Sequence, residues 1–137
     1  MTTNKDICFY DTSSLLLDGS RLISQQEPFV ISSITLEELE NIKTSAHKDS
    51  AIKYSARKLL HLLDTNKNLF EIIIYTDDML EVFNSHGFDI NNDLKILATA
   101  CHYDTYNRPD ETIFVTNDLA LKSIANLFFG EDSIKSV

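Results

Sequence analysis

The feature that most constrains the fold is an alternation of short apolar runs with longer segments of helical periodicity. Apolar runs occupy residues 7–10, 29–34, 70–75 and 112–115, and a short edge strand is expected at residues 134–137. Helical patterns occupy residues 35–44, 49–64, 78–85, 92–104 and 118–128. The apolar runs are nearly continuous, which is typical of strands covered on both faces. The alternation therefore predicts an α/β fold, a three-layer α/β/α sandwich with a mainly parallel central sheet and right-handed crossovers.

Length and composition favour a globular protein with one core. The 137 residues suit a single domain spanning residues 1–137. No apolar stretch approaches the ~20 residues needed to cross a bilayer, and the N-terminal residues lack the apolar core of a signal peptide. We therefore expect a cytoplasmic protein with no membrane association, in which Cys8 and Cys101 are buried, reduced thiols.

The net charge of −9 bears on the partners of this chain. It argues against broad electrostatic capture of nucleic acid, because phosphate binding normally needs a basic surface. It leaves room for a local site in which acids hold a divalent cation, because the cation reverses the sign of the charge that a phosphate meets.

Acids and hydroxyls follow the predicted strands. They are Asp11, Thr12 and Ser13 after the first, Glu37 and Glu38 in the helix after the second, Asp77 and Asp78 after the third, and Thr116, Asn117 and Asp118 after the fourth. Asp93 lies in the first turn of the helical segment 92–104. Sites in open parallel sheets form beyond the carboxyl ends of the strands. Hard divalent cations prefer oxygen ligands, so such a cluster suits magnesium or manganese.

Each acid also has a simpler interpretation. Asp93 and Asp118 stand where helix caps are common, and Thr35 and Glu38 have the spacing of a capping box. Asp11 is harder to explain in this way, because it lies between two apolar runs, where a charged group needs partners or a metal.

Other sites are disfavoured by the sequence. It contains no GxxxxGK[ST] phosphate-binding loop, no GxGxxG fingerprint and no GxSxG elbow. The histidines show no HxH or HxxxH spacing, so we expect surface or packing roles for them; they are His47, His61, His86 and His102.

Four segments in order resemble the motifs of PIN-domain nucleases: "FYDTSSLL", "ISSITLEELENIK", "NDLKILATA" and "FVTNDLALKSIA". Together they extend over about residues 7–128. The first, second and fourth, with "SARKLLHLL" after the second, look closest to the PIN domain that accompanies PhoH-type ATPases.

The resemblance implies a metal-dependent endoribonuclease that hydrolyses phosphodiester bonds of single-stranded RNA, with DNA as a further candidate substrate. By motif, Asp11, Asp93 and Asp118 would be catalytic ligands of Mg²⁺ or Mn²⁺, and Glu38 would complete the cluster. Residues expected to contact phosphate or support the acids are Thr12, Ser13, Thr116 and Asn117. In such folds the third strand lies at the edge of the sheet, so Asp77 and Asp78 are expected to lie outside the site.

A basic group extends over the second and third helical segments and comprises Lys43, Lys48, Lys53, Arg57 and Lys58. It is either a solubilising surface or a strip that positions an RNA backbone. Arg57 and Lys58 are the best candidates for RNA contact, and Lys122, one turn after Asp118, is another.

Two alternatives remain open. A catalytically silent PIN-like module would keep the acids without cleaving, and toxin-like PIN domains suggest an inhibitory protein partner or a homodimer. A phosphoryl-transfer domain is less well supported, because Asp11-Thr12-Ser13 lacks the second Asp of haloacid-dehalogenase-like phosphatases.

Overall fold

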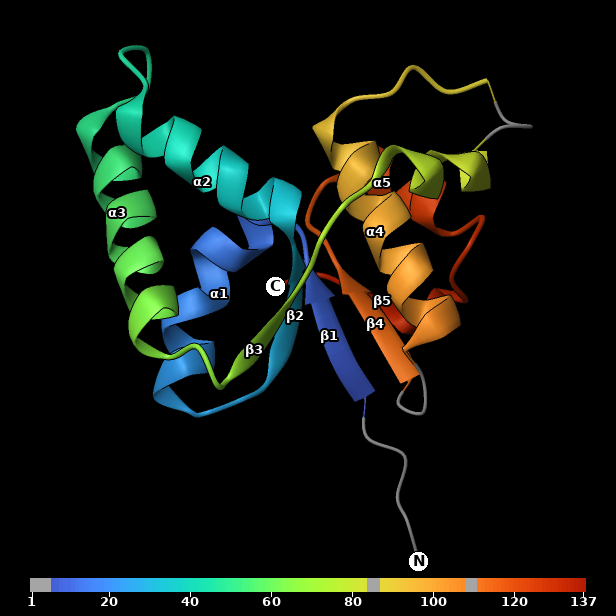
Figure 1. The fold of residues 1–137 in the computed structure, drawn as a ribbon, viewed down its shortest axis with the longest axis horizontal. Coiled ribbons are helices and arrows are strands. Elements are labelled where there is room, and N and C mark those ends of the chain that lie inside the picture. Colours follow the sequence, from blue (N-terminus) through green and yellow to red (C-terminus); the bar gives the residue numbers. More distant parts are fainter. Residues whose placement is uncertain (1–5, 84–86, 108–110) are drawn as a thin grey trace, which may run out of the picture.

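The computed structural model describes residues 6–83, 87–107 and 111–137, and its centre is a five-stranded sheet. The strands are β1 (Asp6–Tyr10), β2 (Phe29–Ser32), β3 (Phe70–Ile73), β4 (Glu111–Val115) and β5 (Ile134–Lys135). They are arranged in the order β3-β2-β1-β4-β5, and every pairing is parallel (Figure 1). The predicted parallel sheet is confirmed, and β3 and β5 lie at its two edges as expected.

In the described part of the chain, five α-helices and two 3₁₀ helices accompany the strands. They are α1 (Thr12–Ser24), α2 (Ser33–Thr44), α3 (Ser50–Thr65), η1 (Asp77–Phe83), α4 (Asn92–Tyr106), α5 (Leu119–Ala125) and η2 (Glu131–Ser133). The sequence analysis did not predict α1. The segment predicted as a helix at 78–85 is the 3₁₀ helix η1, and the last two residues of that prediction lie outside the described residues. Among the helices described, none combines the length and the apolar character required to cross a membrane.

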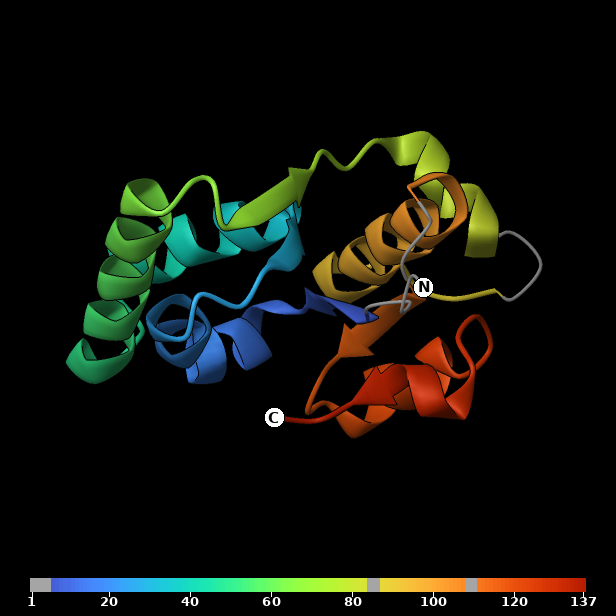
Figure 2. The same cartoon turned by 90° about the horizontal axis from the view of Figure 1, so that it is seen from below.

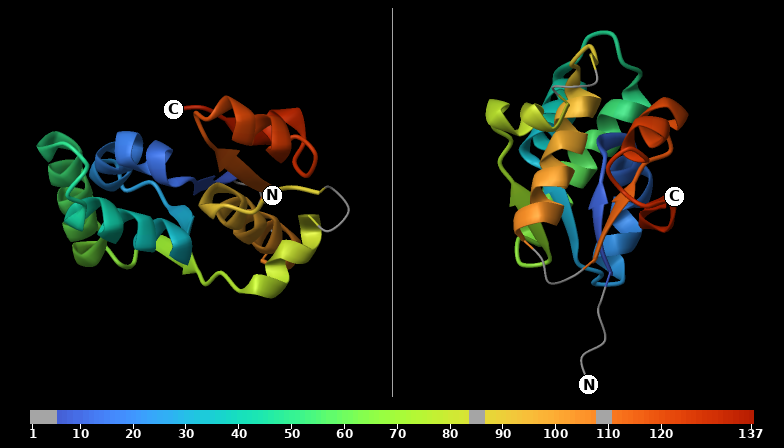
Figure 3. Two further views of the ribbon diagram at one scale, coloured as in Figure 1. Left: turned by 90° about the horizontal axis from the view of Figure 1, so that it is seen from above. Right: turned by 90° about the vertical axis from the view of Figure 1, so that its right-hand side faces the viewer.

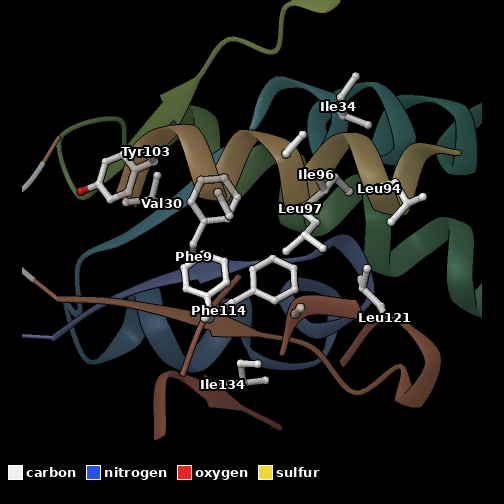
Figure 4. Close-up of a cluster of buried hydrophobic side chains, with 14 of the residues drawn as sticks. Phe9, Val30, Ile34, Leu94, Ile96, Leu97, Tyr103, Phe114, Leu121 and Ile134 are labelled. Carbon is white, nitrogen blue, oxygen red and sulfur yellow. The ribbon is translucent and has the colours of Figure 1, made fainter. Parts of the chain in front are cut away.

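Alternate side chains of each central strand enter two separate cores. Phe9 and Phe114 face one core, where α4 and α5 pack on the sheet, while Tyr10 and Val115 face the other, beneath α1 and α3. Figure 2 shows α1 and α3 on one side of the sheet and α4 on the other. Figure 4 shows the first core, with Phe9 and Phe114 beneath Leu97 of α4. Burial on both faces explains why the strands are nearly continuous apolar runs.

One predicted helix start and one candidate cap are wrong, while the predicted start of α4 at residue 92 is confirmed. The hydroxyl of Ser32 accepts a 3.2 Å hydrogen bond from the N–H of Ile34, so Ser32 caps α2, and Thr35 lies buried inside the helix. Asn91, and not Asp93, caps α4 by accepting a 2.9 Å hydrogen bond from the N–H of Leu94. In both cases a polar side chain upstream of the predicted cap reaches the free backbone N–H groups first.

Candidate active site

The carboxyl ends of the strands and the N-terminus of α4 meet at one edge of the sheet, uppermost in Figure 1 and viewed from above in Figure 3, left. Asp11 follows β1 and Asp118 follows β4, which are neighbours with Tyr10 opposite Val115. Glu38 comes from α2, and Asp93 is the second residue of α4. Four segments that are distant in the sequence therefore each bring one acid to this edge.

Asp11 is both a helix cap and a buried acid. Asp11 is only 2% exposed to solvent. Oδ1 accepts a 2.9 Å hydrogen bond from the N–H of Ser14, in the first turn of α1, and Oδ2 accepts a 2.6 Å hydrogen bond from the hydroxyl of Thr116. These bonds offset part of the cost of burying the charge, and they fix the carboxylate at the end of β1.

Thr116 joins two of the acids. Its buried hydroxyl donates to Asp11, 105 positions earlier in the chain, and accepts a 3.1 Å hydrogen bond from the N–H of Asp118. Oδ1 of Asp118 then accepts a 3.0 Å hydrogen bond from the N–H of Leu121 and caps α5, as one interpretation of the sequence expected. A cap and a site acid are thus compatible roles for Asp118, because its residue remains exposed.

Glu38 is held from two sides. Its Oε1 accepts a 2.6 Å hydrogen bond from the hydroxyl of Thr12, which lies 3.2 Å from the hydroxyl oxygen of the buried Thr35. The side chain of Asn92, at the start of α4, also hydrogen-bonds Glu38. The neighbouring Glu37 is exposed, so α2 turns Glu38 and not Glu37 towards the sheet edge.

The causes of the raised pKa values of Glu38 and Asp93 place the four acids in one electrostatic environment. Burial raises the pKa of Asp93, and the charges of Asp118 and Asp11 raise it further. Burial likewise raises the pKa of Glu38; the charges of Asp93 and Asp11 add to this, and hydrogen bonds from Thr12 and Asn92 oppose it. Within residues 6–83, 87–107 and 111–137, none of the four acids forms an ion pair with a basic side chain.

This arrangement suits a divalent cation in donor type and in charge. All four side chains offer carboxylate oxygens, the ligands that Mg²⁺ and Mn²⁺ prefer, and a cation would relieve their repulsion. In the part of the chain that the structure describes, no three His, Cys, Asp or Glu side chains converge closely enough to ligate one ion together. Magnesium is usually held by one or two carboxylates and keeps several waters. The residues therefore fit an ion with one or two direct carboxylate ligands, the remaining acids acting through water.

Three other predicted site residues, Ser13, Asn117 and Lys122, are described by their exposure and their hydrogen bonds. Ser13 is exposed on the first turn of α1, beside Thr12. Asn117 accepts a 2.7 Å hydrogen bond from the N–H of Val137, and Lys122 donates a 3.0 Å hydrogen bond to Ser136, so both bind the end of the chain.

Arg57 and Lys58 are exposed on α3. Arg57 donates a long hydrogen bond of 3.4 Å to the carbonyl of Lys53. Among the described residues, no hydrogen bond or ion pair links Arg57 or Lys58 to the four acids. Their contact with RNA stays a prediction.

Asp77 and Asp78 begin η1, beyond the edge strand β3. Neither contributes to the raised pKa of Glu38 or Asp93. Their position agrees with the expectation that they lie outside the cluster, since β2 separates β3 from β1.

The structure adds residues that sequence reasoning did not select. A pocket of about 280 Å³ beside the acids is lined by Glu38, Asn41, Ile42, Ser45, Lys48 and Asn92. Lys48 belongs to the basic group named above, but Arg57 and Lys58 were preferred over it. The only sequence signal for Asn92 is its position directly before Asp93.

The cysteines and histidines play no part in the cluster that the described residues form. Cys8 and Cys101 are free and half-buried, and burial raises the pKa of Cys101 to about 12. His47 and His61 are exposed, and the ring of His102 lies 4.6 Å from that of Tyr106. His86 lies outside the described residues.

A family model described as the PIN domain matches residues 8–128, most of the chain. The chain belongs to the PIN-domain family. PIN domains are generally metal-dependent nucleases, which agrees with an acidic site at this edge of the sheet. Comparison with curated proteins finds no match.

Solved structures share the PIN fold at low sequence identity. A domain of a functionally unknown protein from Methanocaldococcus jannaschii is 19% identical with a TM-score of 0.54, over 97% of this chain and 89% of that one. PAE2754 from Pyrobaculum aerophilum is 17% identical with a TM-score of 0.55, over 94% and 83%. VapBC2 from Rickettsia felis, whose structure was determined bound to a DNA fragment from its promoter, is 21% identical with a TM-score of 0.54, over 95% of this chain and 98% of that one.

Proposed function

We propose that this PIN domain is a Mg²⁺- or Mn²⁺-dependent endoribonuclease that hydrolyses phosphodiester bonds of single-stranded RNA. The observation that carries the proposal is the cluster of Asp11, Glu38, Asp93 and Asp118, in which burial and mutual repulsion raise the pKa of two members. Such a cluster is costly unless a cation compensates it. The choice of single-stranded RNA rests on the motif resemblance.

The chain's own residues would hold the reacting groups in place. A divalent ion, when bound, supplies Lewis acidity and lowers the pKa of a coordinated water. Thr116 fixes Asp11 and the backbone of Asp118 relative to each other, and Thr12 and Asn92 fix Glu38. Ser13, exposed on the first turn of α1, is free of the core and would contact a phosphate oxygen. Preorganised groups of this kind lower the barrier because they need not reorganise during the reaction.

The test is cleavage of an end-labelled single-stranded RNA with Mg²⁺, with Mn²⁺ and with EDTA, beside DNA of the same sequence. We expect metal-dependent cleavage, reduced by at least about 10- to 100-fold in Asp11→Asn, the loss that changes around a metal site typically cause. Asp77→Asn is the matched control, because this exposed acid follows a strand but lies outside the cluster. Cleavage that survives in Asp11→Asn or in EDTA would contradict the proposal.

The cleavage assay, together with a metal titration and a test for phosphoaspartate, separates the alternatives. Metal binding without cleavage of any RNA would establish the silent PIN-like module, and a phosphoaspartate would establish a phosphoryl-transfer domain. We also propose an inhibitory protein partner, which is supported by the resemblance to toxin-like PIN domains. A protein that co-purifies with this chain would support this proposal if RNA cleavage appears only after that protein is removed. Homodimer formation and the narrower likeness to PhoH-type PIN domains stay predictions.

A further inference from the structure

Two pockets of similar size adjoin the start of α4. The polar pocket of about 280 Å³, described above, includes Asn92 and Lys48. A second, which we call the apolar pocket after its wall of Phe88, Leu94, Leu121 and Ile124, measures about 300 Å³, and its polar lining is Asp89, Asn91, Asp93 and Asp118. Asn92 and Asp93 are consecutive, so the first residues of α4 separate the two pockets; Glu38 lines one, and Asp93 and Asp118 line the other.

The apolar pocket has a firm hydrophobic wall. It includes Phe88, Leu94, Leu121 and Ile124, of which the two leucines are buried in the core beneath α4 and α5. The ring of Phe88 packs edge-on against Phe83, with ring centroids 5.8 Å apart. Because these side chains are anchored in the core, the pocket exists without rearrangement of the backbone.

Ala120 of α5 lines the apolar pocket and is exposed, so a larger side chain at this position would narrow the pocket. A volume of about 300 Å³ lies at the lower limit of small-molecule pockets (~300–1,000 Å³). A pocket of this volume has room for one ring system.

We infer that the apolar pocket receives the base of the nucleotide next to the scissile phosphate. This inference rests on the proposed function. A nucleotide combines a flat apolar base with a phosphate, and the pocket combines an apolar wall with two of the acids that would hold a divalent ion. Bases of single strands bind by stacking and apolar contact with little regard to sequence. A base held in a duplex cannot enter without being extruded, so the pocket selects single-stranded substrate.

The polar pocket complements this assignment. Beside Glu38, the residues Lys48, Ser45, Asn41 and Asn92 offer hydrogen-bond donors and one positive charge on the other side of α4. Such groups bind sugar and phosphate and fix the register of a strand without reading its sequence. The base beside the apolar wall would thus contribute to strand selection, and the polar pocket would position the backbone.

The binding test uses neutral nucleosides, which avoid repulsion between a phosphate and the ion-free acids. Adenosine and uridine, with ribose as the base-free control, are titrated into the full chain while the methyl NMR signals of Leu121 and Ile124 are followed. We expect saturable shifts with the nucleosides and none with ribose. Ala120→Phe should abolish the shifts by narrowing the pocket. Ala51→Phe is the matched control, because Ala51 is also the second residue of a helix and is exposed.

Cleavage of single-site RNA substrates gives the second readout. A base-free nucleotide on one side of the cleaved bond should lower the cleavage rate about tenfold to hundredfold. Ala120→Phe should lower the rate on intact RNA, but it should cause little further loss on the substrate that already lacks the base. Nucleoside shifts without any cleavage would overturn the proposed nuclease and keep the pocket. Absence of shifts at Leu121 and Ile124, or shifts unchanged by Ala120→Phe, would overturn the pocket whether or not RNA is cleaved.

Discussion

Replacing Thr116 by valine removes one hydroxyl and keeps the shape of a fully buried side chain. The wild-type hydroxyl makes two hydrogen bonds, at 2.6 Å to the carboxylate of Asp11 and at 3.1 Å from the N–H of Asp118. A bond to a charged group contributes about 1.5–3 kcal/mol and a neutral one about 0.5–1.5 kcal/mol. Because Asp11 keeps its bond from Ser14, we expect Thr116→Val to lower the free energy of unfolding by about 3 kcal/mol.

Urea denaturation followed by circular dichroism measures this loss. With an m value of ~1–3 kcal/mol/M, the midpoint should fall by about 1 M or more. Thr116→Ser is the control, because it keeps the hydroxyl and loses only a buried methyl group, worth about 1 kcal/mol. If valine and serine variants unfold at the same midpoint, the hydroxyl does not hold the two acids together and the reasoning is refuted.

Three further predictions concern the charged groups. Asp93→Asn should raise the free energy of unfolding of the ion-free protein at pH 7. The pKa of Asp93 is raised by burial and by two neighbouring charges, so its ionised form costs stability, and the gain should shrink in urea titrations as pH falls through that raised pKa. Asp18→Asn should cost about 1–3 kcal/mol, because it weakens the hydrogen bonds from Arg21 and Tyr10. The hydrogen bond from Arg21, and then that from Tyr10, lower the pKa of Asp18, while burial opposes them. The wild type, but not the variant, should therefore lose this part of its free energy of unfolding as pH falls through the lowered pKa. Parallel plots of unfolding free energy against pH for the two proteins would contradict this prediction. Thr12→Val should raise the pKa of Glu38 further, because the hydroxyl of Thr12 lowers it; an unchanged carboxyl titration by NMR would show that the bond has no such effect.

The sheet could be predicted from the sequence because its physical cause is local. Strands covered on both faces must be apolar at nearly every position, so the runs around Phe9, Val30 and Phe114 stand out in the printed sequence. The residues that follow each strand can also be read directly from the sequence. This is why Asp11 and Asp118 could be predicted at the same edge of the sheet.

The helix α1 was missed because its local signals are mixed. Its first turn contains Ser13 and Ser14, and Gly19 lies in its middle, which are residues that disfavour a helix interior. Two features outweigh them: Asp11 caps the helix, and Leu15 and Leu22 are buried against the sheet. The position of Asp11 between apolar runs indicates a buried charge or a ligand and hides its role as a helix cap.

The internal contacts of the candidate site depend on tertiary pairing. The hydroxyl of Thr12 meets Glu38 across two helices, and that of Thr116 meets Asp11 across two strands. No periodicity in a single sequence reports which hydroxyl will reach which acid. For the same reason Asn92 and Lys48 emerged only when α4 and the α2–α3 connection were seen beside Glu38.

The central claim is that distant acids form one charge cluster that a divalent ion relieves. The most direct test is a carboxyl-detected NMR titration of Asp93 and Glu38, with and without saturating Mg²⁺. The account predicts raised pKa values for both side chains in the absence of the ion and a fall of both below their ordinary values in its presence. Two carboxyl groups that titrate at the same pH with and without Mg²⁺ would contradict it.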